Sequence, residues 1–143
     1  MSAAARIMWE GDCGCVPVTE ECYGSAKVVG MITDRDICMA AYTQGLPLSK
    51  IQVGSVMARA LCSCRVTDSI ATALKILEQN QLHRLLVLDQ DQRLMGLLSL
   101  ADVAREAQRE HARPTKEVTD TQVAEVLEGI SAPRSPRDVA AAA

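Results

Sequence analysis

A short pattern occurs twice in this chain, and the repetition limits the possible folds more than any other feature. Residues 29–36 read VGMITDRD, and residues 95–102 read MGLLSLAD. Gly96 follows Gly30 by 66 residues. In each copy two apolar residues separate the glycine from a Thr or Ser, and an Asp stands three residues further on. Self-similarity of this kind indicates one structural unit built twice.

A second apolar run precedes each copy. These runs are residues 15–18 and 84–87, which lie 69 residues apart because the connection to the glycine run is three residues longer in the first copy. The connections, residues 20–27 and 89–93, are polar, as expected for hairpin turns. The sequence therefore predicts a β-hairpin in each copy.

Helical segments are expected on both sides of each hairpin. Residues 35–42 and 100–109 follow the two hairpins, and residues 70–77 precede the second with apolar side chains at helical spacing. Residues 67–69 offer N-cap groups for that helix. Residues 3–9 form its counterpart in the first copy. The repeated unit is thus strand, helix, strand, strand, helix.

This order predicts an α/β (α+β) protein made of two repeats. The first is expected to span residues 2–52 and to lack its N-terminal strand, whereas the second spans residues 53–110 and begins with a short strand at 61–66. Residues 111–143 form a C-terminal extension, with a short helix at 119–127 and a loose tail rich in Pro and Ala. The apolar face of that helix is expected to consist of Val123, Val126 and Leu127.

The repeated segments resemble those of CBS domain pairs, also called Bateman modules. The resemblance lies in residues 30–36, 96–102, 56–57 and 82–89, and it covers roughly residues 3–108. It implies two CBS repeats packed about a pseudo-twofold axis. In that family the Gly-apolar-apolar-Thr/Ser-x-x-Asp pattern closes a cleft that holds adenosine-containing ligands. We therefore expect an adenine nucleotide or another adenosyl compound as a regulatory ligand.

The chemistry of the motif suits a nucleotide on physical grounds as well. Thr33 and Ser99 each end a strand, and Asp36 and Asp102 each lie in the first turn of the following helix. Both side chains of a motif therefore point toward the helix N-terminus, where free N–H groups and the helix dipole favour phosphate. The carboxylate can accept hydrogen bonds from ribose hydroxyls, and the Thr or Ser hydroxyl can donate to phosphate.

The resemblance also implies which residues face one another. Thr33 and Asp36 are expected to face a wall from the second repeat that consists of Met57, Ala58, His83 and Arg84. The cleft of the second motif is expected to be partial, unless a dimer partner completes it, because the first repeat lacks its strand. A glycine at the start of each motif allows close approach of the backbone. The predicted ligand-binding residues are Thr33, Asp36, Arg35, Gly30, Met57, Ala58, His83, Arg84, Ser99, Asp102 and Gly96.

Several of these residues have a simpler interpretation. Thr-x-x-Asp and Ser-x-x-Asp are also capping-box spacings that only start a helix. Two copies after equivalent strand ends favour the ligand interpretation, and one residue can serve both uses. His83 and Arg84 are either ligand groups or a surface pair, and Arg35 is either a phosphate contact or a solvated charge.

Composition argues against nucleic acid and membranes as partners. The formal net charge is −3, and the 143 residues include no Phe, one Trp and two Tyr. The chain thus lacks the basic field and the stacking rings of nucleic-acid binders. No apolar run approaches the length of a membrane span, and the N-terminus lacks signal-peptide features. We expect a cytoplasmic location.

The cysteines offer a different interpretation. Cys13 with Cys15, and Cys62 with Cys64, form two Cys-x-Cys pairs that together have enough thiolates for a zinc site. This spacing is shorter than structural zinc sites use, and reduced, metal-free thiols are the expectation. Only two histidines are present, which leaves little for acid–base catalysis. We expect no catalytic activity and no cofactor.

Apolar positions after the first motif indicate self-association. Met31, Ile37, Met39 and Ala40 are candidates for burial against a second copy. The expected function is a homodimeric regulatory module that senses an adenine nucleotide. A dimerisation module with empty clefts remains the alternative.

Overall fold

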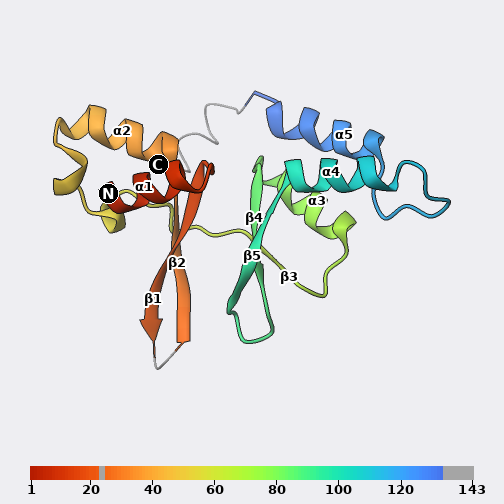
Figure 1. Ribbon diagram of the computed structural model, residues 1–143, viewed down its shortest axis with the longest axis horizontal. Coiled ribbons are helices and arrows are strands. Elements are labelled where there is room, and N and C mark those ends of the chain that lie inside the picture. Colours follow the sequence, from red (N-terminus) through yellow and green to blue (C-terminus); the bar gives the residue numbers. More distant parts are fainter. Residues whose placement is uncertain (23–24, 134–143) are drawn as a thin grey trace. The chain divides into compact units, whose positions relative to one another are not determined.

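The computed structural model describes residues 1–22 and 25–133 and confirms the predicted mixed α/β order of elements (Figure 1). The helices are α1 (Ser2–Glu10), α2 (Asp34–Gln44), α3 (Ile70–Gln79), α4 (Leu100–Glu110) and α5 (Asp120–Ser131). The strands are β1 (Cys15–Cys22), β2 (Ser25–Thr33), β3 (Ser63–Arg65), β4 (Arg84–Leu88) and β5 (Leu94–Ser99). Short 3-10 turns lie at Leu48–Lys50 and Val53–Ser55.

The chain divides into two compact units. Unit 1 comprises residues 1–61 and 91–94, and unit 2 comprises residues 62–90 and the described residues from 95 onward. The predicted repeat boundaries at residues 52 and 110 stay predictions, since residues 53–61 pack with unit 1 and the described part of the C-terminal extension packs with unit 2.

Unit 1 is built on the first hairpin. Strands β1 and β2 are antiparallel, with Cys15 opposite Thr33, and the register shifts between Val18 and Thr19. Helices α1 and α2 supply the apolar side chains that cover this ribbon. Its buried core includes Ala4, Met8, Ile32, Ile37, Ala40, Ile51 and Met57. Ile37 and Ala40 are therefore part of this core, and the expectation that they bury against a second copy was wrong.

The segment after the 3-10 turns packs along β2. Met31 and Ala58 form an antiparallel bridge, with each backbone N–H donating to the other residue's carbonyl at 2.9 Å. A Cβ added at Gly30 would lie 2.8 Å from Cγ of Met57, so this glycine allows a close approach. The described part of unit 1 has a sheet of two strands, whereas the sheet of unit 2 has three.

Unit 2 has a three-stranded sheet in the order β3-β4-β5. Strand β3 is parallel to β4, with Cys64 opposite Val87. Helix α3 begins after Ser69, whose side chain accepts a hydrogen bond from the Thr72 backbone N–H, as expected of an N-cap. The short strand predicted at residues 61–66, at the start of the second repeat, is therefore present as β3, although β3 is shorter than predicted.

The helix of the C-terminal extension is longer than expected and belongs to the core of unit 2. Helix α5 packs against α3 and α4 and buries Val126 and Ile130. Leu127, which was expected on the same face as Val123 and Val126, is 48% exposed. The expected loose tail lies largely in residues 134–143, outside the described residues.

Candidate functional site

The first motif forms a complete capping box at the start of α2. The backbone N–H and the hydroxyl of Thr33 each donate to Oδ2 of Asp36 at 2.8 Å. The Asp36 N–H donates back to Oγ1 of Thr33 at 3.2 Å. Thr33 is thus the N-cap and Asp36 the third residue of the helix, which confirms the capping interpretation.

The capping box orients the Asp36 carboxylate through only one of its two oxygens. Oδ2 accepts both hydrogen bonds from Thr33, whereas Oδ1 accepts none from any residue that the structure describes. A carboxylate oxygen has two lone pairs, so Oδ1 can accept two further hydrogen bonds. Asp36 therefore presents a fixed acceptor at the N-terminus of α2.

The backbone of unit 1 brings further predicted residues close to this turn. The Asp34 N–H donates to the carbonyl of Gly14 at 3.1 Å, which joins the residue before β1 to the start of α2. Gly30 and Met57 approach closely along β2, and Ala58 bridges to the same strand. Arg35 is exposed on the first turn of α2, and its backbone N–H donates to Oδ1 of Asp34 at 2.7 Å.

The second motif repeats this geometry in unit 2. The Ser99 backbone N–H and hydroxyl donate to Oδ2 of Asp102 at 2.9 and 2.6 Å, and the Asp102 N–H returns a 3.1 Å bond to Oγ. The Leu100 N–H donates to the carbonyl of His83 at 3.1 Å. His83 therefore occupies the position that Gly14 occupies in unit 1. An added Cβ at Gly96 would meet no atom within 4 Å, unlike one at Gly30.

Arg105 makes the two motifs different. Its Nη2 donates to Oδ1 of Asp102, the oxygen that is unoccupied in Asp36. Hydrogen bonding from Ser99 lowers the pKa of the Asp102 carboxyl, and the Arg105 guanidinium lowers it further. The residue three positions after Asp36 is Met39, which cannot donate. Sequence reasoning missed this pair, although the Asp-x-x-Arg spacing on a helix signals it.

His83 and Arg84 lie at the edge of unit 2 where β4 begins, and both are exposed. The structure brings His83 next to the second motif through its backbone carbonyl. The expectation that both side chains face Thr33 and Asp36 concerns two separate units and stays a prediction.

Two adjoining hollows in unit 1 were not anticipated from the sequence. One, of about 260 Å³, lies between α1 and α2, and the other, of about 590 Å³, extends to Asp12 and Gly14. Both include Trp9, which is 88% exposed, and Asp34 at the start of α2. An exposed tryptophan among apolar helix positions was the available signal, since large apolar side chains on a surface often mark binding sites.

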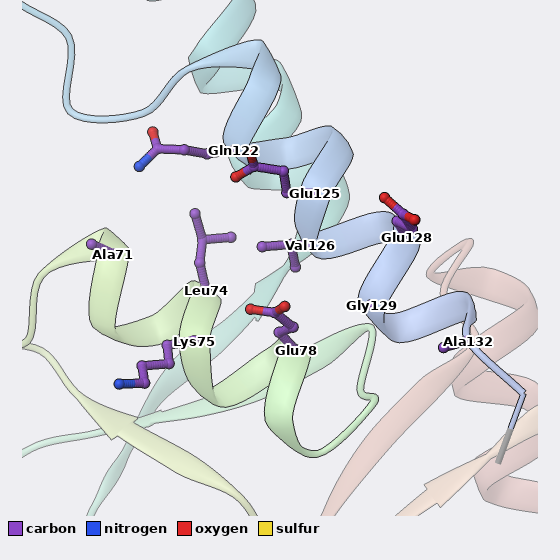
Figure 2. A pocket seen from close by; sticks show the side chains of 10 residues that line it. All are labelled: Ala71, Leu74, Lys75, Glu78, Gln122, Glu125, Val126, Glu128, Gly129 and Ala132. Atoms are coloured by element: carbon purple, nitrogen blue, oxygen red, sulfur yellow. The ribbon is translucent and has the colours of Figure 1, made fainter. Parts of the chain in front are cut away.

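A larger groove of about 670 Å³ lies between α3 and α5 in unit 2 (Figure 2). Leu74 and Val126 point into the space between the helices, and Glu78 lies beside Gly129. Carboxylates outnumber cations around it, with Glu78, Glu125 and Glu128 against Lys75. This groove contains none of the residues predicted from the repeated motif.

The five cysteines whose side chains the structure describes do not gather into a metal centre. Cys13, Cys15, Cys38, Cys62 and Cys64 form no disulfide bond. Within residues 1–22 and 25–133, no three His, Cys, Asp or Glu side chains come together as metal ligands. Burial, with a contribution from Asp68, raises the pKa of the Cys64 thiol. No helix in this same portion of the chain has the length and apolar character needed to cross a bilayer.

Comparison with known proteins agrees with the duplicated motif and capping geometry. The family model described as "CBS domain" matches residues 1–42 and 53–109. The chain belongs to the CBS-domain family. Each match contains one of the two capping boxes, so both are parts of CBS repeats.

CBS-domain proteins from bacteria are among its relatives. Hypoxic response protein 1 of Mycobacterium tuberculosis is 32% identical over 105 residues, which are 73% of this chain and 71% of that protein. A crystal structure of that protein with two coordinated zinc ions has a TM-score of 0.62 at 31% identity and covers 73% of this chain and 81% of its own. The CBS domain-containing protein YhcV of Bacillus subtilis is 36% identical over 101 residues, 71% of this chain and 68% of YhcV.

The crystal structure of CBSX2 in complex with AMP shares the CBS fold with this chain. Its TM-score is 0.64 at 24% identity, and the match covers 77% of this chain and 82% of CBSX2. At this identity the likeness establishes the fold alone.

Proposed function

We propose that this CBS-domain protein is a regulatory module that binds an adenine nucleotide at the N-terminal turn of α2. The observation that carries the proposal is the Asp36 carboxylate, whose Oδ2 is fixed by Thr33 while Oδ1 remains available. A preoriented acceptor reduces the entropy lost when a ligand binds. The AMP held by CBSX2 supports the ligand class, since that protein has the same fold.

The available oxygen suits a ribose. Two vicinal hydroxyls can donate to the two lone pairs of Oδ1, and a hydrogen bond to a charged acceptor contributes about 1.5–3 kcal/mol. The surroundings of Asp36 are partly buried, so water competes less than at a fully exposed carboxylate. Asp36 is therefore the ribose-binding group in this proposal, and Thr33 orients it.

The phosphate needs a positive charge in addition to the helix dipole. Helix α2 has two carboxylates in its first turn, Asp34 and Asp36, which oppose the attraction of the helix N-terminus for an anion. Arg35 is exposed in that turn and provides a guanidinium suited to phosphate. We assign Arg35 the phosphate contact.

A calorimetric titration of the purified chain with AMP, ADP, ATP, S-adenosylmethionine and GMP tests the proposal. Saturable binding of at least one adenosyl compound, with GMP weaker, is the expected result. The mass of any small molecule released on denaturation identifies a ligand that is already bound. If none of the adenosyl compounds binds and none is released, the alternative of a dimerisation module without ligand replaces this proposal.

We further propose that the chain forms a homodimer through the outer face of α2. Met39 and Tyr42 are 49% and 82% exposed there, three residues apart on the helix. Burying both would remove apolar surface from water, and a twofold axis would do so with one patch. Light scattering should give twice 15.4 kDa for the parent and 15.4 kDa for Tyr42→Glu. A monomeric parent at micromolar concentration would refute the dimer.

A further inference from the structure

The helix pair that borders the hollow in unit 1, α1 and α2, has a counterpart in unit 2 that a third helix covers. In unit 2 the corresponding helix pair, α3 and α4, is covered by α5, which buries Val126 and Ile130 four residues apart. The described part of unit 1 contains no helix in the equivalent position, and Trp9 is 88% exposed there.

The correspondence holds residue by residue. The hollow is lined by Ala5, Met8, Trp9, Cys13, Asp34 and Ile37. Equivalent residues of the two repeats lie 69 positions apart before the hairpin turn and 66 positions apart after it. The counterparts of the lining residues are therefore Leu74, Leu77, Glu78, Leu82, Leu100 and Val103. The five apolar counterparts belong to or pack against the core that includes Val126 and Ile130, and Glu78 lies against Gly129 of α5. The hollow in unit 1 is therefore the equivalent of the surface on which α5 packs, and no helix among residues 1–22 and 25–133 fills it.

The size and chemistry of the hollow fit apolar side chains. Its volume is about 260 Å³. An apolar cavity of about 150 Å³ is already large enough for benzene, so this space can accept two aliphatic side chains of a helix. Val126 and Ile130 show the required spacing, because residues four apart lie on one face of a helix.

Asp12 determines which helix fits. Its counterpart is Gln81, and both residues have a left-handed backbone, with φ of 47° and 49°. The Gln81 amide donates to the carbonyls of Gly129 and Ala132 at 3.3 and 2.9 Å and so caps the end of α5. An ionised Asp12 has no proton to donate and would repel such carbonyls. It instead requires a cationic donor from the last turn of the helix.

Charge on the rim supports the same conclusion. Asp12 and Asp34 line the adjoining hollow, and neither forms an ion pair within residues 1–22 and 25–133. Helix α5 has no basic residue in its last turn and carries Glu125 and Glu128, so α5 of a second copy is poorly suited to this place. A Lys or Arg in the last helical turn also interacts favourably with the helix dipole.

We propose that the hollow between α1 and α2 is a docking site for an amphipathic helix of a partner protein, which presents two aliphatic side chains four residues apart and a basic side chain to Asp12 and Asp34. The residues that line this hollow do not include the ribose-binding group Asp36. The partner helix in unit 1 takes the place that α5 takes in unit 2.

Two peptides and one substitution test the proposal. The first peptide has the sequence of residues 119–132 with Glu128→Lys and Ser131→Lys, and the second has the unchanged sequence. Trp9 is the single tryptophan of the chain, so its emission reports on this hollow. In the parent the basic peptide should shift Trp9 emission to shorter wavelength and bind more tightly than the unchanged peptide.

The variant Asp12→Gln recreates the residue of unit 2 and should reverse this preference. An exposed ion pair contributes about 0.2–1 kcal/mol, so each change in affinity should be roughly 1.5- to 5-fold. Gln81 shows that glutamine accepts this backbone conformation, and circular dichroism verifies the fold. Failure of both peptides to shift Trp9 emission at millimolar concentration would overturn the proposal. The proposal is also overturned if the parent and the variant bind each peptide with the same affinity. A shift of Trp9 emission with protein concentration, in the absence of peptide, would overturn it as well.

Discussion

Arg105 donates a hydrogen bond to Oδ1 of Asp102, whereas the equivalent oxygen of Asp36 has no partner among the described residues. The two capping boxes are otherwise alike. A ribose that approached Asp102 would have to displace the guanidinium, at the cost of a charge-assisted hydrogen bond. We therefore expect the two motifs to differ in ligand binding because of one residue on α4.

Exchanging the residues at this position should exchange the behaviour of the two motifs. Arg105→Met frees Asp102 and should add a second, weaker AMP site, whereas Met39→Arg should weaken the first site by roughly 1.5- to 5-fold, as an exposed pair contributes about 0.2–1 kcal/mol. Calorimetric stoichiometry and affinity measure both. Arg109→Met, which removes the Arg109–Glu106 pair further along α4, is the control. An effect of Arg109→Met equal to that of Arg105→Met would contradict this explanation.

The lowered pKa of Asp102 predicts a dependence of stability on acid pH. Since Ser99 and then Arg105 stabilise the ionised form in the folded chain, the contribution is fully present above the unfolded value of 3.8 and is lost as the pH falls below it. Asp102→Asn should therefore lower the free energy of unfolding at neutral pH, by no more than about 1 kcal/mol because this carboxylate, the third residue of α4, is 44% exposed. This difference should diminish below 3.8 in urea titrations. A constant difference would show that protonation of Asp102 is irrelevant.

The two motif glycines should respond differently to alanine. At Gly30 a new Cβ would lie 2.8 Å from Cγ of the buried Met57, so Gly30→Ala should cost about 1–3 kcal/mol of stability through overpacking. At Gly96 the space is open, and Gly96→Ala should change stability by no more than about 0.5 kcal/mol. Urea denaturation compares the two. Equal losses would mean that the approach of Met57 does not constrain the first motif.

The thiols should react in order of exposure and acidity. Cys13 and Cys38 are exposed, whereas Cys64 is 6% exposed and has a raised pKa because of burial, so less of it is the reactive thiolate. Limited treatment with iodoacetamide, followed by mass spectrometry of peptides, should find Cys13 and Cys38 modified first and Cys64 last. Elemental analysis should find no zinc. One zinc per chain, with loss of the fold on chelation, would restore the interpretation of the Cys-x-Cys pairs as ligands.

Local sequence patterns predicted the parts of the fold that depend on neighbours in the chain. The strand end at Thr33 and the carboxylate of Asp36 lie three residues apart, and this spacing alone forms the capping box. The alternation of apolar and polar runs similarly placed both hairpin segments and the helix that begins after Ser69.

Features that depend on packing between distant segments were not predictable in the same way. Ile37 and Ala40 look like surface positions in the α2 sequence, but they are buried because α2 packs on its own hairpin. The buried face of α5 includes Ile130 instead of Leu127 because α3 and α4 fix its rotation. A helical pattern specifies an apolar face but not the element that covers it.

The calorimetric titration of AMP into Asp36→Ala and Asp102→Ala, next to the parent, tests the central claim most directly. Removal of Asp36 loses hydrogen bonds from a charged acceptor, about 1.5–3 kcal/mol, so AMP affinity should fall roughly tenfold to hundredfold. Asp102→Ala should bind like the parent, because Arg105 already occupies that carboxylate. Each Asp is part of a capping box, so circular dichroism must first show both variants folded. Folded Asp36→Ala that binds AMP as tightly as the parent, with binding lost in Asp102→Ala, would contradict the account.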